Sequence, residues 1–222
     1  MASTRLLCVA VLVAASFAGP SVAAAAPHFD VTITNITKAQ TITPILVFSH
    51  RAGVKLFSLG QSASVEMEEL AESGYLVDLM ALLEANPDVG EVAAAPSSLK
   101  SGESVTLTVA SGDLYNQVSM AAMLIPTNDG FFAVVGATSS MGKPITIYAP
   151  AYDAGTEAND ELCAHIPGPP EVCGFGEGYN PSRDGAEGFI HVHEAIHGVG
   201  DLAASTYDWR NPVAQVEIVR VN

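Results

Sequence analysis

Short segments of alternating or continuously apolar residues recur along this chain, and turn-forming residues separate them. Residues 29–34 (FDVTIT) and 105–109 (VTLTV) alternate apolar and polar side chains, which is typical of strands with one buried face. Residues 118–125 are apolar on both faces, and we expect them to form a central strand. The same patterns predict strands at residues 43–49, 54–59, 131–135, 145–149, 189–192 and 213–221. Many short strands joined by turns predict an all-β fold, an antiparallel β-sandwich.

One stretch replaces this strand pattern with a helical period. Ser64 is a suitable N-terminal cap for a short helix, acidic residues follow it in the first turn, and Gly74 is a suitable stop. Apolar side chains then recur at positions 76, 79, 80 and 83, before Pro87 ends the pattern. We therefore expect two short helices, inserted between about Ser64 and Ala85.

The first 26 residues have the features of a secretory signal peptide. Arg5 is their only charged residue, an apolar run follows at 6–15, and small residues at 21–26 (SVAAAA) offer a cleavage site. The mature domain is then expected to span residues 27–222. No later segment is apolar for long enough to cross a bilayer. We therefore expect a secreted or otherwise extracytoplasmic protein, in the periplasm or at the cell exterior.

Charge and cysteine content narrow the choice of partners. The net charge of −15 disfavours nucleic acid and bare anionic membranes. Loss of the signal peptide leaves two cysteines, Cys163 and Cys173, and in an oxidising compartment one disulfide between them is the simplest expectation. The sequence lacks the second pair of thiols that a cysteine zinc site would use.

Residues 150–161 (PAYDAGTEANDE) carry four carboxylates within nine positions: Asp153, Glu157, Asp160 and Glu161. No Lys or Arg occurs from position 144 to 182, so the sequence supplies no nearby positive charge. Carboxylates this close repel one another, and a hard cation with oxygen ligands, such as Ca²⁺, would offset the repulsion. The spacing is not that of an EF-hand loop. A solvated acidic loop explains the same composition, and both interpretations stay open at this point.

Residues 193–197 (HEAIH) fit the H-E-x-x-H pattern of zinc peptidases, in which His193 and His197 bind the metal and Glu194 is the general base. That pattern functions on a helix, whereas the preceding residues alternate like a strand and glycines follow immediately. A zinc peptidase is therefore kept only as the alternative function. His191 and His193 would share one face of a strand, where a transition-metal site competes with histidines that bond to neighbouring backbone.

Four segments together resemble a bacterial spondin domain, similar to the amino-terminal domains of F-spondin and mindin. They are residues 120–137 (MAAMLIPTNDGFFAVVGA), 151–161 (AYDAGTEANDE), 197–202 (HGVGDL) and 208–221 (DWRNPVAQVEIVRV). The resemblance covers nearly all of the mature chain. It implies an eight-stranded antiparallel β-sandwich similar to calcium-dependent lipid-binding domains, with a calcium ion held by loops at one end.

The same resemblance implies which residues bind calcium. Asp129 (TNDG) and Asp153 (YDAGT) match two carboxylates of the family's site. The third, a glutamate on the strand before the central one, falls at or near Thr108, which has no carboxylate. Candidate replacements are Glu157, Asp160 and Asp113, besides backbone carbonyls and water. We therefore predict a Ca²⁺ site that consists of Asp129, Asp153, Glu157 and Asp160.

The function implied by the resemblance is that of a secreted, non-enzymatic, calcium-binding domain used in adhesion or extracellular surface interaction. Its partner, beyond calcium, is an unidentified protein, glycan or surface. The zinc metallopeptidase is the alternative, and calcium-bridged binding to a lipid surface rests on fold analogy alone.

Overall fold

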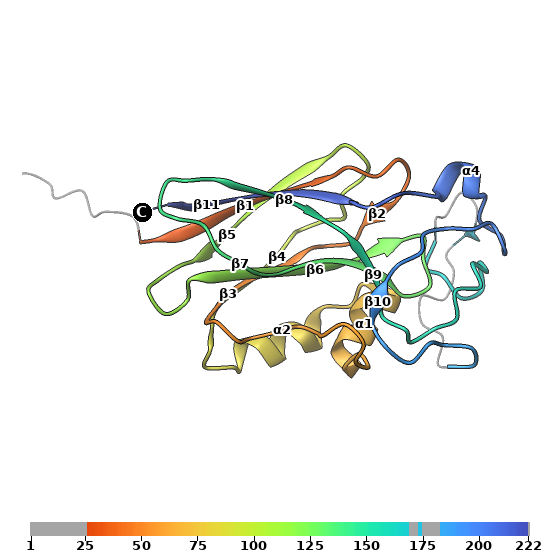
Figure 1. The fold of residues 1–222 in the computed structure, drawn as a ribbon, viewed down its shortest axis with the longest axis horizontal. Helices are drawn as coiled ribbons and strands as arrows, with labels where there is room; N and C mark the ends of the chain where they lie inside the picture. Colours follow the sequence, from red (N-terminus) through yellow and green to blue (C-terminus); the bar gives the residue numbers. More distant parts are fainter. Residues whose placement is uncertain (1–25, 169–172, 175–182, 222) are drawn as a thin grey trace, which may run out of the picture.

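The computed structural model describes residues 26–168, 173–174 and 183–221, and these form two antiparallel sheets packed face to face (Figure 1). One sheet contains β1 (His28–Asn35), β5 (Ser104–Ala110), β8 (Ile145–Ala149) and β11 (Ala214–Val221). The other contains β2 (Thr41–Ile42), β3 (Leu46–His50), β4 (Val89–Ala94), β6 (Gln117–Ile125), β7 (Gly130–Ala137), β9 (Ala151–Asp153) and β10 (His191–Val192). The strand orders are β5–β1–β11–β8 and β10–β9–β7–β6–β3–β4, and β2 pairs with β6.

The predicted antiparallel β-sandwich is confirmed. Among the described residues, eight strands have five residues or more, and β2, β9 and β10 add two or three residues each. Two details of the strand assignment are wrong. Residues 54–59 follow turns and bends, and their apolar side chains pack beside the helices without strand pairing. The pattern also missed β4, which pairs with β3 and begins directly after Asp88.

The strands bury side chains in the way their periods indicate. On β1, the alternating residues Phe29, Val31 and Ile33 are fully buried between the sheets. On β6, Met120 belongs to this inter-sheet core, whereas Ala121 belongs to a second core on the opposite face of the same sheet. The expectation of a central strand buried on both faces is therefore confirmed for β6.

Two helices cover the outer face of the seven-stranded sheet (Figure 1) and create that second core. They are α1 (Val65–Ser73) and α2 (Val77–Glu84), both within the range expected from the sequence. The hydroxyl of Ser64 accepts a hydrogen bond from the Met67 amide, as an N-terminal cap does, and Gly74 ends α1 with φ of 71°. The predicted pair of inserted helices is confirmed, cap and stop included.

Loops and a short helix, α4 (Ala204–Tyr207), gather at the end of the sandwich where β6 passes into β7 (Figure 1). There Cys163 and Cys173 form the predicted disulfide, with their sulfur atoms 2.08 Å apart. The predicted signal peptide lies, up to residue 25, outside the described residues and stays a prediction. Within the described ranges, no helix is both long and apolar enough to cross a membrane.

One carboxylate of α1 is buried under this end of the sheet. Glu72 is 1% exposed, and neither of its carboxylate oxygens has a hydrogen-bond partner among the described residues. Burial, the largest effect, raises the pKa of the Glu72 carboxyl, the nearby Thr156 hydroxyl lowers it, the charge of Glu68 raises it and Arg183 lowers it; together they place it at about 7. The folded protein therefore retains the Glu72 proton at a pH where the unfolded chain has lost it.

We expect Glu72→Gln to stabilise the protein at pH 8 and to change little at pH 4.5. Because the folded pKa is raised, wild type loses stability as the pH rises from about 4.5 through 7, and the neutral amide removes that loss. The expected gain at pH 8 is about 1–3 kcal/mol in the free energy of unfolding, measured by urea denaturation. Glu84→Gln, on the exposed side of α2, is the matched control. Equal effects of Glu72→Gln at both pH values would contradict this assignment.

Candidate metal centre

Asp129 occupies the turn between β6 and β7, yet its side chain is completely buried. The Thr127 hydroxyl closes the turn by bonding to the Leu124 carbonyl and accepting from the Gly130 amide. The loop after β9 folds over it: Oδ2 of Asp129 accepts from the amides of Thr156 (2.7 Å) and Glu157 (3.1 Å). Oδ1 has no hydrogen-bond partner among the described residues. The turn therefore presents one buried oxygen that has no hydrogen-bond donor among the described residues.

Asp153 lies beside Asp129 because β9 pairs with β7 in a register that places Asp153 opposite Gly130. Its side chain is fully buried. Oδ1 accepts a hydrogen bond from the Gly155 amide and Oδ2 accepts one from the Asn159 side chain, both at 2.7 Å. Burial, followed by the charge of Asp153, raises the pKa of Asp129 to about 7. Burial also raises the pKa of Asp153. Two predicted calcium ligands are thus adjacent. A cation between them would offset the free-energy cost of ionising each buried carboxylate.

Glu157 and Asp160 meet at the side chain of Asn128. Its amide nitrogen lies 3.1 Å from Oδ1 of Asp160 and 3.5 Å from Oε2 of Glu157. Asp160 also accepts from the Leu162 amide and lies 2.5 Å from Nδ1 of His165. Burial alone would raise the pKa of Asp160, but these hydrogen bonds lower it below its ordinary value. The backbone amide of Glu157 therefore keeps this residue next to Asp129, whereas the Asp160 carboxylate contacts the imidazole of His165.

Burial decides against the solvated acidic loop. Asp153, Glu157 and Glu161 are 0%, 1% and 3% exposed. The Glu161 carboxylate accepts hydrogen bonds from three successive amides, those of residues 197, 198 and 199. The Glu161 amide in turn donates to Oδ1 of Asn128 at 3.2 Å. The acidic stretch is therefore folded into the end of the sandwich and links three loops there.

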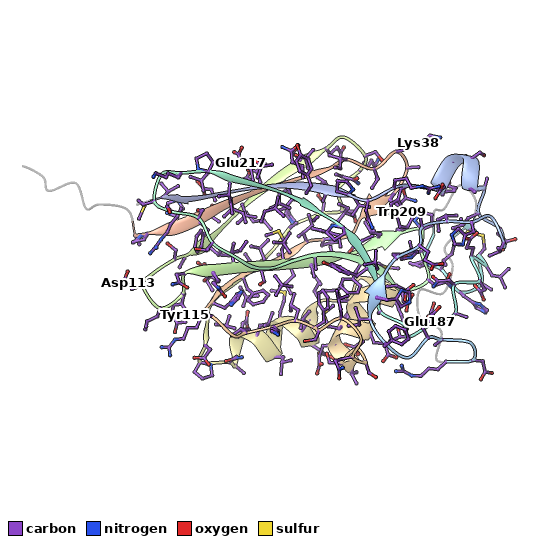
Figure 2. All side chains as sticks on the ribbon, viewed as in Figure 1. Lys38, Asp113, Tyr115, Glu187, Trp209 and Glu217 are labelled. Carbon is purple, nitrogen blue, oxygen red and sulfur yellow. A yellow bond between two sulfur atoms is a disulfide. The ribbon has the colours of Figure 1, made fainter. Side chains whose placement is uncertain are left out.

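One of the residues that the sequence offered in place of the third calcium carboxylate, Asp113, is wrong. Thr108 lies near the end of β5 that pairs with the start of β1, and its hydroxyl donates to Asp30. Asp113 follows β5, and Figure 2 shows it at the opposite end of the molecule from Glu187. Asp113 therefore cannot complete a site at Asp153. Thr108 lies on β5 in the four-stranded sheet, whereas Asp129 and Asp153 lie at the end of β7 and β9 in the seven-stranded sheet.

Two further residues stand next to Asp153: His191, which the sequence offered as a transition-metal ligand together with His193, and Glu187, which the sequence did not suggest. Strand β10 pairs with β9 so that His191 faces Asp153, and Nε2 of His191 lies 3.5 Å from Oδ1 of Asp153. The same nitrogen lies 4.0 Å from Oε2 of Glu187. One ligand atom from each of the three residues lies within 4.8 Å of the others. The strand pattern at residues 189–192 was visible in the sequence, but not its pairing with β9.

The HEAIH segment does not have the geometry of a zinc peptidase. Residues 193–197 are not helical, and Ala195 has a positive φ of 73°, which no α-helix contains. His193 is buried against Trp209, and its Nδ1 accepts from the Ala195 amide at 2.9 Å, while His197 is exposed. The two imidazoles therefore lack the shared helical face on which the peptidase alternative depends. Backbone bonding, the simpler expectation, holds for His193.

The donor set at Asp129 and Asp153 fits a hard divalent cation. The available atoms are carboxylate oxygens, one of them, Oδ1 of Asp129, buried without a partner. Among the described residues, the nitrogen group that faces Asp153 is the imidazole of His191, and no Lys or Arg side chain forms an ion pair with it. Glu157 and backbone carbonyls of the enclosing loop lie near enough in the chain to add oxygen ligands.

We expect Glu161→Gln to destabilise the protein by about 2–3 kcal/mol, because hydrogen bonds to a charged acceptor are stronger than those to a neutral one. The amide group of glutamine would also turn a donor towards backbone N–H groups. Thermal and urea unfolding measure the effect. Glu194→Gln, which changes an exposed glutamate of the neighbouring loop, should stay within about 0.5 kcal/mol of wild type. Equal stability of the two variants would show that the Glu161 contacts contribute nothing.

Comparison with protein families matches residues 34–159 to the family described as Spondin_N, and this range is more than half of the chain. It contains Asp129, Asp153 and Glu157 and ends before Asp160, Glu187 and His191. A search of curated proteins finds no match.

Proposed function

The chain belongs to the Spondin_N family, and from this we propose that it is an extracellular, non-enzymatic calcium-binding domain that acts in adhesion or surface interaction. Family membership and the Cys163–Cys173 disulfide fit an extracellular protein, because disulfides persist in oxidising compartments. The proposal names Asp129 and Asp153 as the principal calcium ligands. Glu157 and Asp160 are the further candidates from the same loop.

One observation carries the calcium proposal: two fully buried carboxylates lie side by side, and one oxygen of Asp129 has no hydrogen-bond partner among the described residues. A buried polar atom without a partner costs about 1–3 kcal/mol, and more when it is charged. Ca²⁺ takes six to eight oxygens at 2.3–2.6 Å and accepts irregular geometry. An ion at this position would therefore satisfy Oδ1 of Asp129 and remove its repulsion with Asp153.

Calcium would also connect loops that provide a binding surface. The turn before β7, the loop after β9 and the segment before β10 all end at this pair of aspartates. A cation here would fix their relative positions, which a surface used in adhesion requires. The adhesive partner is a protein, glycan or surface that the chemistry of these loops does not specify.

We expect calcium to raise the melting temperature of the mature protein and EDTA to lower it. The gain in stability is about 2.7 kcal/mol at a hundredfold excess over Kd. Asp129→Asn and Asp153→Asn should remove the calcium response. Asp113→Asn, an acidic substitution at the opposite end of the sandwich, should retain it. A response that survives both site substitutions would place the ion elsewhere, and no response in wild type would refute the proposal.

We expect Asp129→Asn to stabilise the protein when calcium is absent and to destabilise it when calcium is in excess. The raised pKa of Asp129 means that wild type loses stability as the pH rises through about 7, whereas asparagine carries no charge to repel Asp153. The amide oxygen can still accept from Thr156 and Glu157. At pH 8 in EDTA the variant should therefore unfold at a higher urea concentration than wild type, and in excess calcium at a lower one. A variant less stable under both conditions would contradict this account.

A further inference from the structure

The ring of His191 is oriented as metal-binding imidazoles are. Its Nδ1 lies 3.1 Å from the carbonyl oxygen of Val192, and a carbonyl only accepts, so Nδ1 carries the hydrogen. In the neutral ring the lone pair is then on Nε2. This atom is buried and has no hydrogen-bond partner among the described residues. A backbone carbonyl on the far nitrogen is the usual outer contact of a histidine that ligates through Nε2.

Asn159 orients the two carboxylates that face this nitrogen. Its side-chain nitrogen donates to Oδ2 of Asp153 at 2.7 Å and to Oε1 of Glu187 at 3.4 Å. The other oxygen of each carboxylate, Oδ1 of Asp153 and Oε2 of Glu187, is the one near His191. Glu187 is thus held by Oε1 and presents Oε2 to this nitrogen. Asp153 is held at both oxygens, because Oδ1 also accepts from the Gly155 amide, and it faces the nitrogen with Oδ1.

The separations suit a small metal ion after a slight closure. Zinc binds nitrogen and oxygen at about 2.0–2.2 Å, so tetrahedral ligands are about 3.4 Å apart. The nitrogen of His191 lies 3.5 Å from Asp153 and 4.0 Å from Glu187. Asp153 is fully buried, whereas the Glu187 side chain is 32% exposed. Binding of an ion would require Oε2 of Glu187 to move closer to Nε2 of His191.

A pocket of about 470 Å³ gives access to this point. Its walls include Asn159, Glu187, His191, His193, Glu194 and His197. An ion at Asp153, Glu187 and His191 would therefore have protein ligands on one side and a pocket on the other for water or a partner's side chain. Three protein ligands with an accessible fourth position are a coordination that zinc adopts, and the pocket gives the ion an entry path.

We propose that Asp153, Glu187 and His191 hold a first-row transition-metal ion of the zinc type, adjacent to the calcium position. An imidazole nitrogen suits Zn²⁺, Co²⁺ or Ni²⁺, whereas Ca²⁺ takes oxygen ligands. Glu187 and His191 lie outside the residues that match the family, so the family match does not imply this metal site. It shares Asp153 with the proposed calcium site but does not depend on calcium at Asp129.

The test titrates metal-free, tag-free mature protein with Zn²⁺ by calorimetry and with Co²⁺ by visible absorption. Wild type should bind one equivalent, and Co²⁺ should give the d–d bands of mixed nitrogen and oxygen ligands. His191→Gln and Glu187→Gln should each weaken Zn²⁺ binding by at least about tenfold. His197→Gln, which changes an exposed histidine of the same pocket, should bind as wild type does.

Two substitutions separate this proposal from the calcium proposal. Asp129→Asn should abolish the calcium response and keep Zn²⁺ binding, whereas His191→Gln should do the reverse. The retained calcium response also shows that the His191 variant is folded. Unchanged Zn²⁺ affinity in both His191→Gln and Glu187→Gln would overturn the proposal. Absence of stoichiometric Zn²⁺ binding in wild type would also overturn it, and would leave His191 as a protonated counter-charge to Asp153.

Discussion

The burial of two adjacent carboxylates, Asp129 and Asp153, is the constraint on which one end of this sandwich depends. Both side chains are fully buried, and the charges raise each other's cost of ionisation. The protein partly offsets that cost with amide donors from Thr156 and Glu157 and with the Asn159 side chain. The remaining oxygen of Asp129 receives nothing from the described residues. In our proposal a cation completes this arrangement, and binding of the ion is then coupled to the folding of these loops.

The loops around the pair are held together by the same kind of contact, a carboxylate that accepts from backbone amides. Glu161 accepts from three successive amides of the segment that follows β10, and Asn128 links Glu161 to the turn that carries Asp129. Close packing reinforces this connection: a Cβ on Gly200 would lie 2.3 Å from the carbonyl oxygen of Asp160. Acidic residues thus have two roles at this end, because some fix the loops and others remain available to an ion.

Local patterns predicted most of the fold, and only part of the site. Period-two alternation identified β1 and β5, and capping residues identified α1, because these features depend on near neighbours in sequence. The pairing of β10 with β9 brings His191 to Asp153 from 38 positions away, and no local signal encodes that register. Distance in the fold likewise excluded Asp113, which the sequence allowed as a ligand. The H-E-x-x-H pattern misled for a related reason. Its spacing brings the two histidines together only on a helix, and the positive φ of Ala195 shows that these residues are not helical.

Hydrogen exchange of the mature protein, followed by mass spectrometry with and without calcium, tests most directly whether an ion completes this end of the sandwich. The account predicts slower exchange with calcium in residues 127–130 and 153–161, whose amides surround the aspartate pair. It predicts little change in β1 and β5, whose ladder lies in the other sheet. Identical exchange of the aspartate loops in calcium and in EDTA would contradict the account. Protection spread evenly over both sheets would contradict it as well, because the ion would then act elsewhere.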